Sequence, residues 1–176
     1  NELLKQAVPD IAFYWGDVLR GKGRISVIGK PKVAKSFFVM QMGLSIATGS
    51  EFLGMQTKKG TVLYVNFEIS EEKLQERVQD MCSEMGITDV SNFLTVSISG
   101  GMALETEEGR KHLEEAIIEA GLEQGYPDVV ILDPRRNSMA ADENQSEILT
   151  KWCNNVDRLR EEYGITTVIV HHAGKS

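Results

Sequence analysis

Cysteines and long apolar runs are scarce in this chain of 176 residues. The two cysteines, Cys82 and Cys153, lie far apart in segments with helical patterns. A disulfide framework is therefore excluded, and a reduced, cytoplasmic protein is the simplest expectation. No apolar run approaches the ~20 residues of a membrane-spanning helix, and no signal peptide is recognisable. We therefore expect no association with a membrane.

Positive charge is also in short supply. The chain has 19 Lys and Arg residues against 26 Asp and Glu residues, which leaves a net charge of -7. This balance excludes a protein that coats nucleic acid with its whole surface, although a local basic groove or loops contributed by an oligomer remain compatible with it. Repeats, low-complexity tracts and linkers are absent, so we expect residues 1–176 to form a single domain.

One octet, Gly29-Lys30-Pro31-Lys32-Val33-Ala34-Lys35-Ser36, differs at a single position from the phosphate-binding P-loop, G-x-x-x-x-G-K-[ST]. The exception is Ala34, which stands at the second glycine. In a P-loop the backbone N–H groups surround the phosphate oxygens, the lysine reaches the β- and γ-phosphates, and the hydroxyl binds Mg²⁺. The octet and the adjoining Phe37 are thus the candidate nucleotide-binding residues.

The surroundings of the octet decide between a P-loop and a surface turn rich in Gly and Lys. A P-loop follows a strand and begins a helix, whose N-terminus then faces the phosphates. Arg24–Ile28 is short and β-branched, whereas Phe37–Thr48 is too long for one strand and ends at Gly49. This context favours binding of a nucleoside triphosphate.

Further along the chain, strand-like apolar runs alternate with amphipathic helical patterns. This alternation predicts an α/β fold with a mostly parallel sheet. The expected strands are Thr61–Phe67, Phe93–Ile98, Val129–Leu132 and Thr166–Val170. The expected helices run from Ser70 to Met85 before Gly86, from about Glu105 to Ala120 before Gly121, and onward from near Glu143.

Two carboxylates follow strands of this pattern. Asp133 would lie at the carboxyl end of a buried strand, where ligands bind in open α/β sheets, and resembles a Walker B aspartate that orients Mg²⁺ through water. Glu68 ends the second strand and can orient the water that attacks the γ-phosphate, provided that its strand lies beside the strand of Asp133. The alternatives are a solvated aspartate that begins a loop and a surface glutamate near a helix start.

His171 and His172 end the last strand. Adjacent strand residues point to opposite faces, so at most one of them faces the nucleotide. A zinc site is disfavoured, because His112 and the two cysteines lack metal-ligand spacing.

Arg135 and Arg136 come just after Asp133. Their position is compatible with contact to phosphate or to a neighbouring subunit, and equally with a pair of solvated surface residues. The aromatic residues Phe13, Tyr14 and Trp15 are expected to pack in the core before the first strand.

Four segments together resemble the RecA-like ATPases of the RepA type, the hexameric replicative helicases of plasmids and phages. They are GKPKVAKS, LYVNFEISEEKLQERV, VVILDPRRNSMAADENQSE and VIVHHAGKS, and they span Arg24 to Ser176. The resemblance implies a RecA-like core of three αβα layers, a homo-oligomeric ring that is a hexamer, ATP bound between subunits, and single-stranded DNA as a partner.

Site roles also follow from this resemblance. Lys35 and Ser36 would be the P-loop pair, Glu68 the catalytic glutamate, and His172 the γ-phosphate sensor, which favours His172 over His171. Asp133 would be the Walker B residue, so that Ser36 and Asp133 hold Mg²⁺. Arg136, Glu143 and Asn144 match the block after Asp133 without an assigned role.

Two departures limit the resemblance. Ala34 adds a methyl group where the P-loop has glycine, which favours weaker affinity. The chain begins at Asn1 rather than Met and ends before the DNA-contacting loops and arginine finger of such rings, so we expect a fragment truncated on its C-terminal side. A RecA-like signalling or recombination ATPase, and a module that binds nucleotide without hydrolysis, stay open as alternatives.

Overall fold

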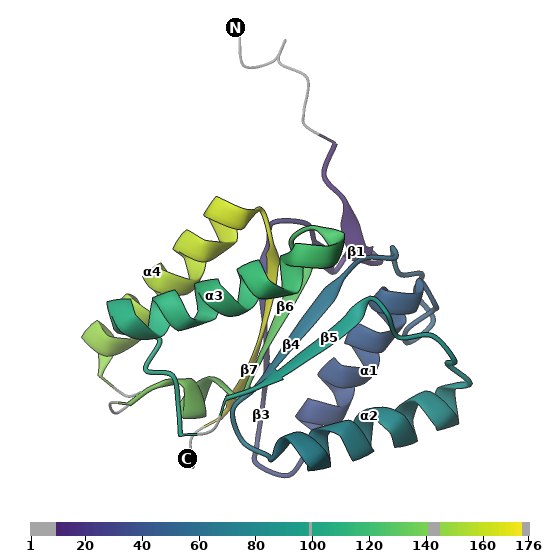
Figure 1. Cartoon of the computed structure of the whole chain (residues 1–176), viewed down its shortest axis with the longest axis horizontal. Helices are drawn as coiled ribbons and strands as arrows, with labels where there is room; N and C mark the ends of the chain where they lie inside the picture. The colour runs from purple at the N-terminus through teal and green to yellow at the C-terminus, as the bar shows by residue number, and fades with distance from the viewer. Residues whose placement is uncertain (1–9, 99, 141–144, 174–176) are drawn as a thin grey trace, which may run out of the picture.

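A computed structural model describes residues 10–98, 100–140 and 145–173 of the chain. Its centre is a parallel sheet of five strands in the order β3-β7-β6-β4-β5 (Figure 1). The strands are β3 (Arg24–Gly29), β4 (Val62–Asn66), β5 (Phe93–Ser97), β6 (Val129–Asp133) and β7 (Thr166–His172). The helices are α1 (Lys35–Thr48), α2 (Glu71–Met85), α3 (Glu107–Gln124) and α4 (Ser146–Tyr163), with a 3-10 turn, η2, over Arg135–Ser138.

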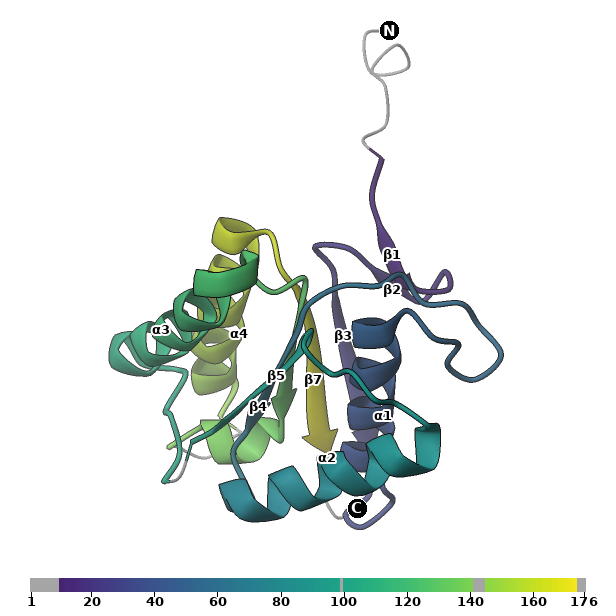
Figure 2. The same ribbon diagram turned by 45° about the vertical axis from the view of Figure 1, so that its right-hand side comes forward.

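The helices cover the two faces of this sheet. In Figures 1 and 2, α1 and α2 lie on one face, and α3 and α4 lie on the other. The expected three-layer α/β architecture is therefore confirmed. Every crossover links parallel strands through at least one helix, which is the connection that parallel strands require.

Residue alternation along the strands creates two cores. Val62, Tyr64 and Ile131 belong to the core beneath α1, whereas Leu63 and Leu132 belong to the core beneath α3 and α4. Because successive side chains point to opposite faces, the parity of a residue number assigns each strand residue to one core. The continuous apolar run Val129–Leu132 is buried on both faces, as such strands require.

A small antiparallel hairpin precedes the sheet. Its strands are β1 (Phe13–Trp15) and β2 (Leu19–Arg20), which sequence reasoning did not separate from the lead-in to β3. Tyr14 and Trp15 pack in the core beneath α1, as predicted. Phe13, at the start of β1, is 42% exposed, so its predicted place in the core is wrong. The Tyr14 hydroxyl donates a hydrogen bond of 2.7 Å to Asp128, just before β6, and so ties the hairpin to the sheet.

The predicted end of the third helix is wrong. Gly121 does not end the third helix, since α3 continues to Gln124. A Cβ atom at position 121 would lie 2.8 Å from Cδ1 of Tyr126, so this glycine provides space for a ring rather than a helix stop. The predicted start of the last helix near Glu143 lies outside the described residues, in which α4 begins at Ser146.

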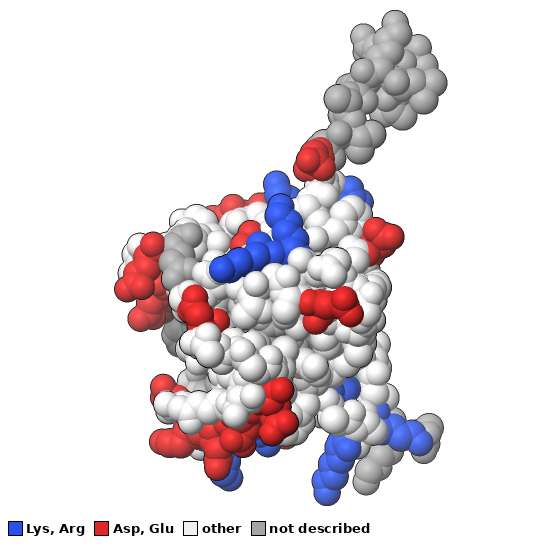
Figure 3. Space-filling model, turned by 90° about the vertical axis from the view of Figure 1, so that its right-hand side faces the viewer, with Lys and Arg blue, Asp and Glu red and all other residues white. Residues whose placement is uncertain are grey.

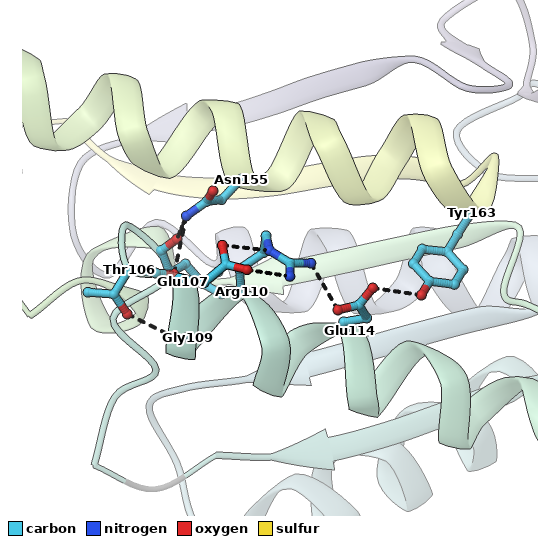
Figure 4. Close-up of polar contacts among 8 residues, drawn as sticks. Thr106, Glu107, Gly109, Arg110, Glu114, Asn155 and Tyr163 are labelled. Atoms are coloured by element: carbon cyan, nitrogen blue, oxygen red, sulfur yellow. Dashed lines mark hydrogen bonds and ion pairs between the residues drawn. The ribbon is translucent and has the colours of Figure 1, made fainter.

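A buried arginine stabilises the layer of α3 and α4 (Figure 4). Arg110 is 4% exposed and forms ion pairs of 2.8 Å with Glu107 and 2.9 Å with Glu114. Glu114 in turn accepts a hydrogen bond of 2.8 Å from the Tyr163 hydroxyl at the end of α4. This network joins the two helices on the face of the sheet opposite α1.

Candidate functional site

The strand order brings the predicted site residues to one edge of the sheet. β7 lies between β3 and β6, and Gly29 pairs with His172. β4 lies beside β6, and Asn66 pairs with Asp133, so the condition set for Glu68 is met. All four strands end at this edge, which is where open α/β sheets bind ligands.

Strand alternation selects the face of the sheet on which these side chains lie. Val168 and Val170 of β7 face the α1 core, so His172 is on the α1 side and His171 is on the opposite side. The same alternation places Asp133 of β6 on the α1 side, because it lies two residues after Ile131. His172 and Asp133, which come from two strands far apart in the sequence, therefore share one face of the sheet.

The loop between β3 and α1 has the backbone of a phosphate-binding loop. Lys32 and Ala34 adopt left-handed φ values of 63° and 58°, and such a conformation turns successive N–H groups toward a common point. Ala34 is the N-cap of α1 with no side-chain cap, which leaves the amides of the first helical turn available to an anion. Lys35 begins the helix, is 6% exposed, and donates hydrogen bonds to the carbonyls of Gly29 (2.9 Å) and Lys30 (2.6 Å).

A pocket of about 330 Å³ opens above this loop. It is lined by Lys32, Val33, Ala34, Lys35, Ser36, Phe37, Glu68, Ile69, Arg77 and His172. Most of the predicted nucleotide-binding residues thus face one cavity together with Glu68 and His172. Gly29, Lys30 and Pro31 are not among the lining residues, and the first two instead hold the Lys35 ammonium through their carbonyls.

Asp133 is a buried carboxylate beside this pocket. Burial raises the pKa of its carboxyl, an effect that the hydroxyls of Tyr64 and Ser36 oppose; Glu68 raises this pKa further and His172 lowers it. The Tyr64 hydroxyl donates a hydrogen bond to Oδ2. Within the described part of the chain, the other oxygen, Oδ1, has no hydrogen-bond partner.

This arrangement fits Mg²⁺. The ion is usually held by one or two protein oxygens together with waters and substrate phosphates, so a hydroxyl and one water-bridged carboxylate form a sufficient set. Ser36 on the loop and the unpartnered Oδ1 of Asp133 would supply these two oxygens. Among the described residues, no group of three or more His, Cys, Asp or Glu side chains could hold a metal ion.

Glu68 is exposed in the turn between β4 and α2. The side chain of Asn66, the last residue of β4, shapes this turn by accepting hydrogen bonds of 3.1 Å from the N–H groups of Glu68 and Ile69. Sequence reasoning missed Asn66. The sequence does contain a signal for Asn66: it is a polar residue at the end of an otherwise apolar strand, two positions before a candidate carboxylate.

The two histidines have different neighbours. His172 lines the pocket, and its Nδ1 is buried with no hydrogen-bond partner among the described residues. His171 lies 3.2 Å from the guanidinium of Arg135, between Nε2 and Nη2. Arg135 therefore contacts β7 on the face opposite the pocket, whereas Arg136 is exposed.

Arg77 of α2 is a lining residue that sequence reasoning did not select. Its guanidinium lies 5.1 Å from the ring centroid of Phe37, and both residues also line an adjoining hollow of about 380 Å³ between α1 and α2. Nothing in the local pattern distinguished Arg77 from other exposed charges on a helix. Only the packing of α2 across the loop brings it to the pocket.

The surface around the site carries charge of both signs. Figure 3 shows the face formed by α1 and α2, where acidic side chains gather in the lower part and basic side chains project at the lower edge. The exposed acidic residues of α2 are Glu71, Glu72, Glu76, Asp80 and Glu84. This face therefore disfavours contact with a polyanion along α2.

The fold and the loop together define a P-loop nucleoside triphosphatase core. A family model described as an AAA domain, AAA_25, matches residues 2–176. The chain therefore belongs to this family of P-loop ATPases. The comparison with curated proteins found no match. No helix in the described ranges combines the length and the apolar character needed to cross a membrane.

Proposed function

We propose that this chain binds ATP with Mg²⁺ and hydrolyses the γ-phosphate. The observation that carries the proposal is the convergence of Lys35, Glu68 and His172 on one pocket beside the buried Asp133. A lysine that binds phosphate and a carboxylate that positions water are recurring parts of enzymes that transfer a phosphoryl group to water. The histidine fits the γ-phosphate sensor that the resemblance to the RepA type implies.

Each side chain has a distinct part in the proposed mechanism. The loop amides and the Lys35 ammonium bind and stabilise the charge of the phosphate oxygens. Glu68 is exposed to the pocket and orients a water for in-line attack on the γ-phosphate. His172 lies beside the loop and contacts the γ-phosphate through a ring nitrogen. Ser36, and Asp133 through water, would hold a Mg²⁺ ion, and that ion would supply positive charge beside the phosphates.

ATP binding and ATP turnover test separate parts of this proposal. Lys35→Ala should abolish ATP binding in a calorimetric titration, whereas Lys59→Ala, which changes an exposed lysine outside the pocket, should bind as the native chain does. Glu68→Gln should keep ATP affinity and release phosphate far more slowly, with a small residual turnover. If Lys35→Ala binds ATP as tightly as the native chain, the P-loop assignment is wrong.

The biological output that we propose is motor action on single-stranded DNA in plasmid or phage replication, within a homo-oligomeric ring that is a hexamer. It rests on the four sequence blocks that resemble the RepA type, of which Glu143, Asn144 and Gly174 to Ser176 lie outside the described residues. Single-stranded DNA should stimulate ATP turnover by the full-length protein. Unchanged turnover would argue against this output, and of the RecA-like alternatives it would favour a signalling ATPase over a recombination ATPase, which also acts on DNA.

A nucleotide-binding module without hydrolysis is the second candidate function. The specific observation in its favour is Ala34, which has the left-handed φ of a glycine but carries a methyl group at the phosphate loop. This candidate predicts that the native chain binds ATP without turnover and that Ala34→Gly restores turnover. Measurable turnover by the native chain rejects it.

A further inference from the structure

Asn66 has a buried side chain whose polar atoms are all occupied. The residue is 4% exposed, and its Oδ1 accepts hydrogen bonds of 3.1 Å from the N–H groups of Glu68 and Ile69. Its Nδ2 donates to the carbonyl of Ile69 at 2.5 Å and to the Ser97 hydroxyl at 2.9 Å. One amide therefore fixes the turn around Glu68 and joins it to the end of β5.

The main chain just before Glu68 is also held by hydrogen bonds, here to β6 and to the turn that follows it. The N–H of Phe67 donates to the carbonyl of Asp133 at 2.9 Å, and the carbonyl of Phe67 accepts from Nδ2 of Asn137 at 3.3 Å. The strand that ends in Asp133 and the turn that follows it thus hold Phe67. Asn66 is the group that holds the next two residues, Glu68 and Ile69.

The Glu68 side chain itself has little to restrain it. It is exposed and lines the pocket, and its position depends on the backbone from which it extends. A loop carboxylate on an unrestrained backbone would sample many positions, and a misplacement of about 1 Å can cost on the order of 10²-fold in rate. The restraint on the backbone therefore has a direct chemical consequence.

We propose that Asn66 is a positioning residue for Glu68, so that the amide of Asn66 sets the place of the water-orienting carboxylate relative to the phosphate loop. This inference rests on the proposed function, because it takes Glu68 as the group that orients the attacking water. Asn66 does not line the pocket, so it acts through the turn and not on the nucleotide.

The experiment compares Asn66→Ala with a matched control, Asn155→Ala. Asn155 also holds a turn through its amide, with hydrogen bonds of 2.8 Å and 3.2 Å to the carbonyls of Leu104 and Thr106, but on the opposite face of the sheet (Figure 4). Asn66→Ala should lower kcat by about 10-fold to 100-fold and change the Kd for ATP by less than about threefold. Asn155→Ala should leave both values unchanged.

A double-variant cycle separates positioning from general structural support. In the Glu68→Gln background the carboxylate is absent, so adding Asn66→Ala should lower the residual turnover by less than about twofold. A loss in that background equal to the loss in the native background would overturn the proposal. So would an Asn66→Ala variant that loses ATP affinity and kcat in proportion.

If Asn66→Ala does not fold, Ser97→Ala tests whether Asn66 positions Glu68. This change removes one hydrogen bond of Asn66 and leaves its contacts with the turn in place, so kcat should fall by about threefold at constant ATP affinity. Native turnover by Ser97→Ala would then overturn the proposal. Failure of the proposed function has a different signature, because Glu68→Gln itself would keep its turnover.

Discussion

Ala34→Gly is the change that most directly tests the description of the phosphate loop. Ala34 has a φ of 58°, in the left-handed region, where a Cβ atom crowds the following carbonyl. Glycine adopts this conformation without that conflict. The substitution removes one methyl group and leaves every polar group of the loop in place.

The expected gain in stability is the difference between two opposing effects. A left-handed residue with a Cβ atom costs about 1–2 kcal/mol, and the greater freedom of glycine in the unfolded chain costs about 0.5–1 kcal/mol. The central values leave a net stabilisation of roughly 0.75 kcal/mol, within a range of about 0–1.5 kcal/mol. For a chain of this length, the midpoint of thermal unfolding should rise by about 1–4 °C.

Two further alanines calibrate the measurement by differential scanning calorimetry. Ala103 also has a positive φ, 46°, but lies outside the pocket, so Ala103→Gly should stabilise the chain by a similar amount. Ala116 lies within α3, where a glycine costs about 0.5–1 kcal/mol, so Ala116→Gly should lower the midpoint. A fall for Ala34→Gly as large as that for Ala116→Gly would refute the left-handed backbone at position 34.

The ATP affinity of Ala34→Gly shows whether the methyl group of Ala34 obstructs the phosphates. We expect the loop to have its left-handed backbone in both the free and the bound chain, and strain common to the two forms does not enter the binding free energy. We therefore expect Ala34→Gly to change the Kd for ATP by less than about threefold. A tenfold gain in affinity would mean that the methyl group obstructs the phosphates.

Three other changes test the electrostatics of the buried Asp133 and the packing of the core beneath α3 and α4. Asp133→Asn should raise the thermal midpoint of the nucleotide-free chain at pH 7, because burial raises the pKa of Asp133 and the charged form therefore costs stability. This advantage should disappear below about pH 4, where the carboxyl is protonated in both folded and unfolded chains. Tyr64→Phe removes the hydroxyl that donates to this buried carboxylate, and urea unfolding should show a loss of roughly 1.5–3 kcal/mol. Trp152→Ala empties a core site that is 1% exposed, and the same assay should show a loss of roughly 3–5 kcal/mol.

Much of the fold followed from local patterns. The run Val129–Leu132 predicted a strand buried on both faces, and the structure confirms it. The strand and helix patterns on either side of the octet from Gly29 to Ser36 favoured a phosphate loop over a surface turn, and the octet does join β3 to α1. Gly49 and Gly86 end their helices in left-handed conformations, as predicted from their positions after apolar stripes. Gly121 was misinterpreted because the reason for its glycine is the ring of Tyr126, a contact that no helical pattern reveals.

The separate parts of the candidate site were also present in the sequence. Asp133 and Glu68 were selected because each follows an apolar strand, and His172 because of the resemblance to a known family. Alternation along a strand limited the pocket to one histidine of the adjacent pair, since it depends only on the backbone. Which face of the sheet held α1, and therefore which histidine met the loop, required the packed structure.

The sequence by itself determined the elements, the phosphate loop and the chemical types of the site residues, because these depend on neighbours close along the chain. Only the tertiary structure decided that β7 lies between the strands of the loop and of Asp133, so that His172 pairs with Gly29. It also decided the contacts of Asn66, Tyr64 and Arg77, whose partners come from other elements. Contacts between distant segments depend on how whole layers pack, and no local pattern records them.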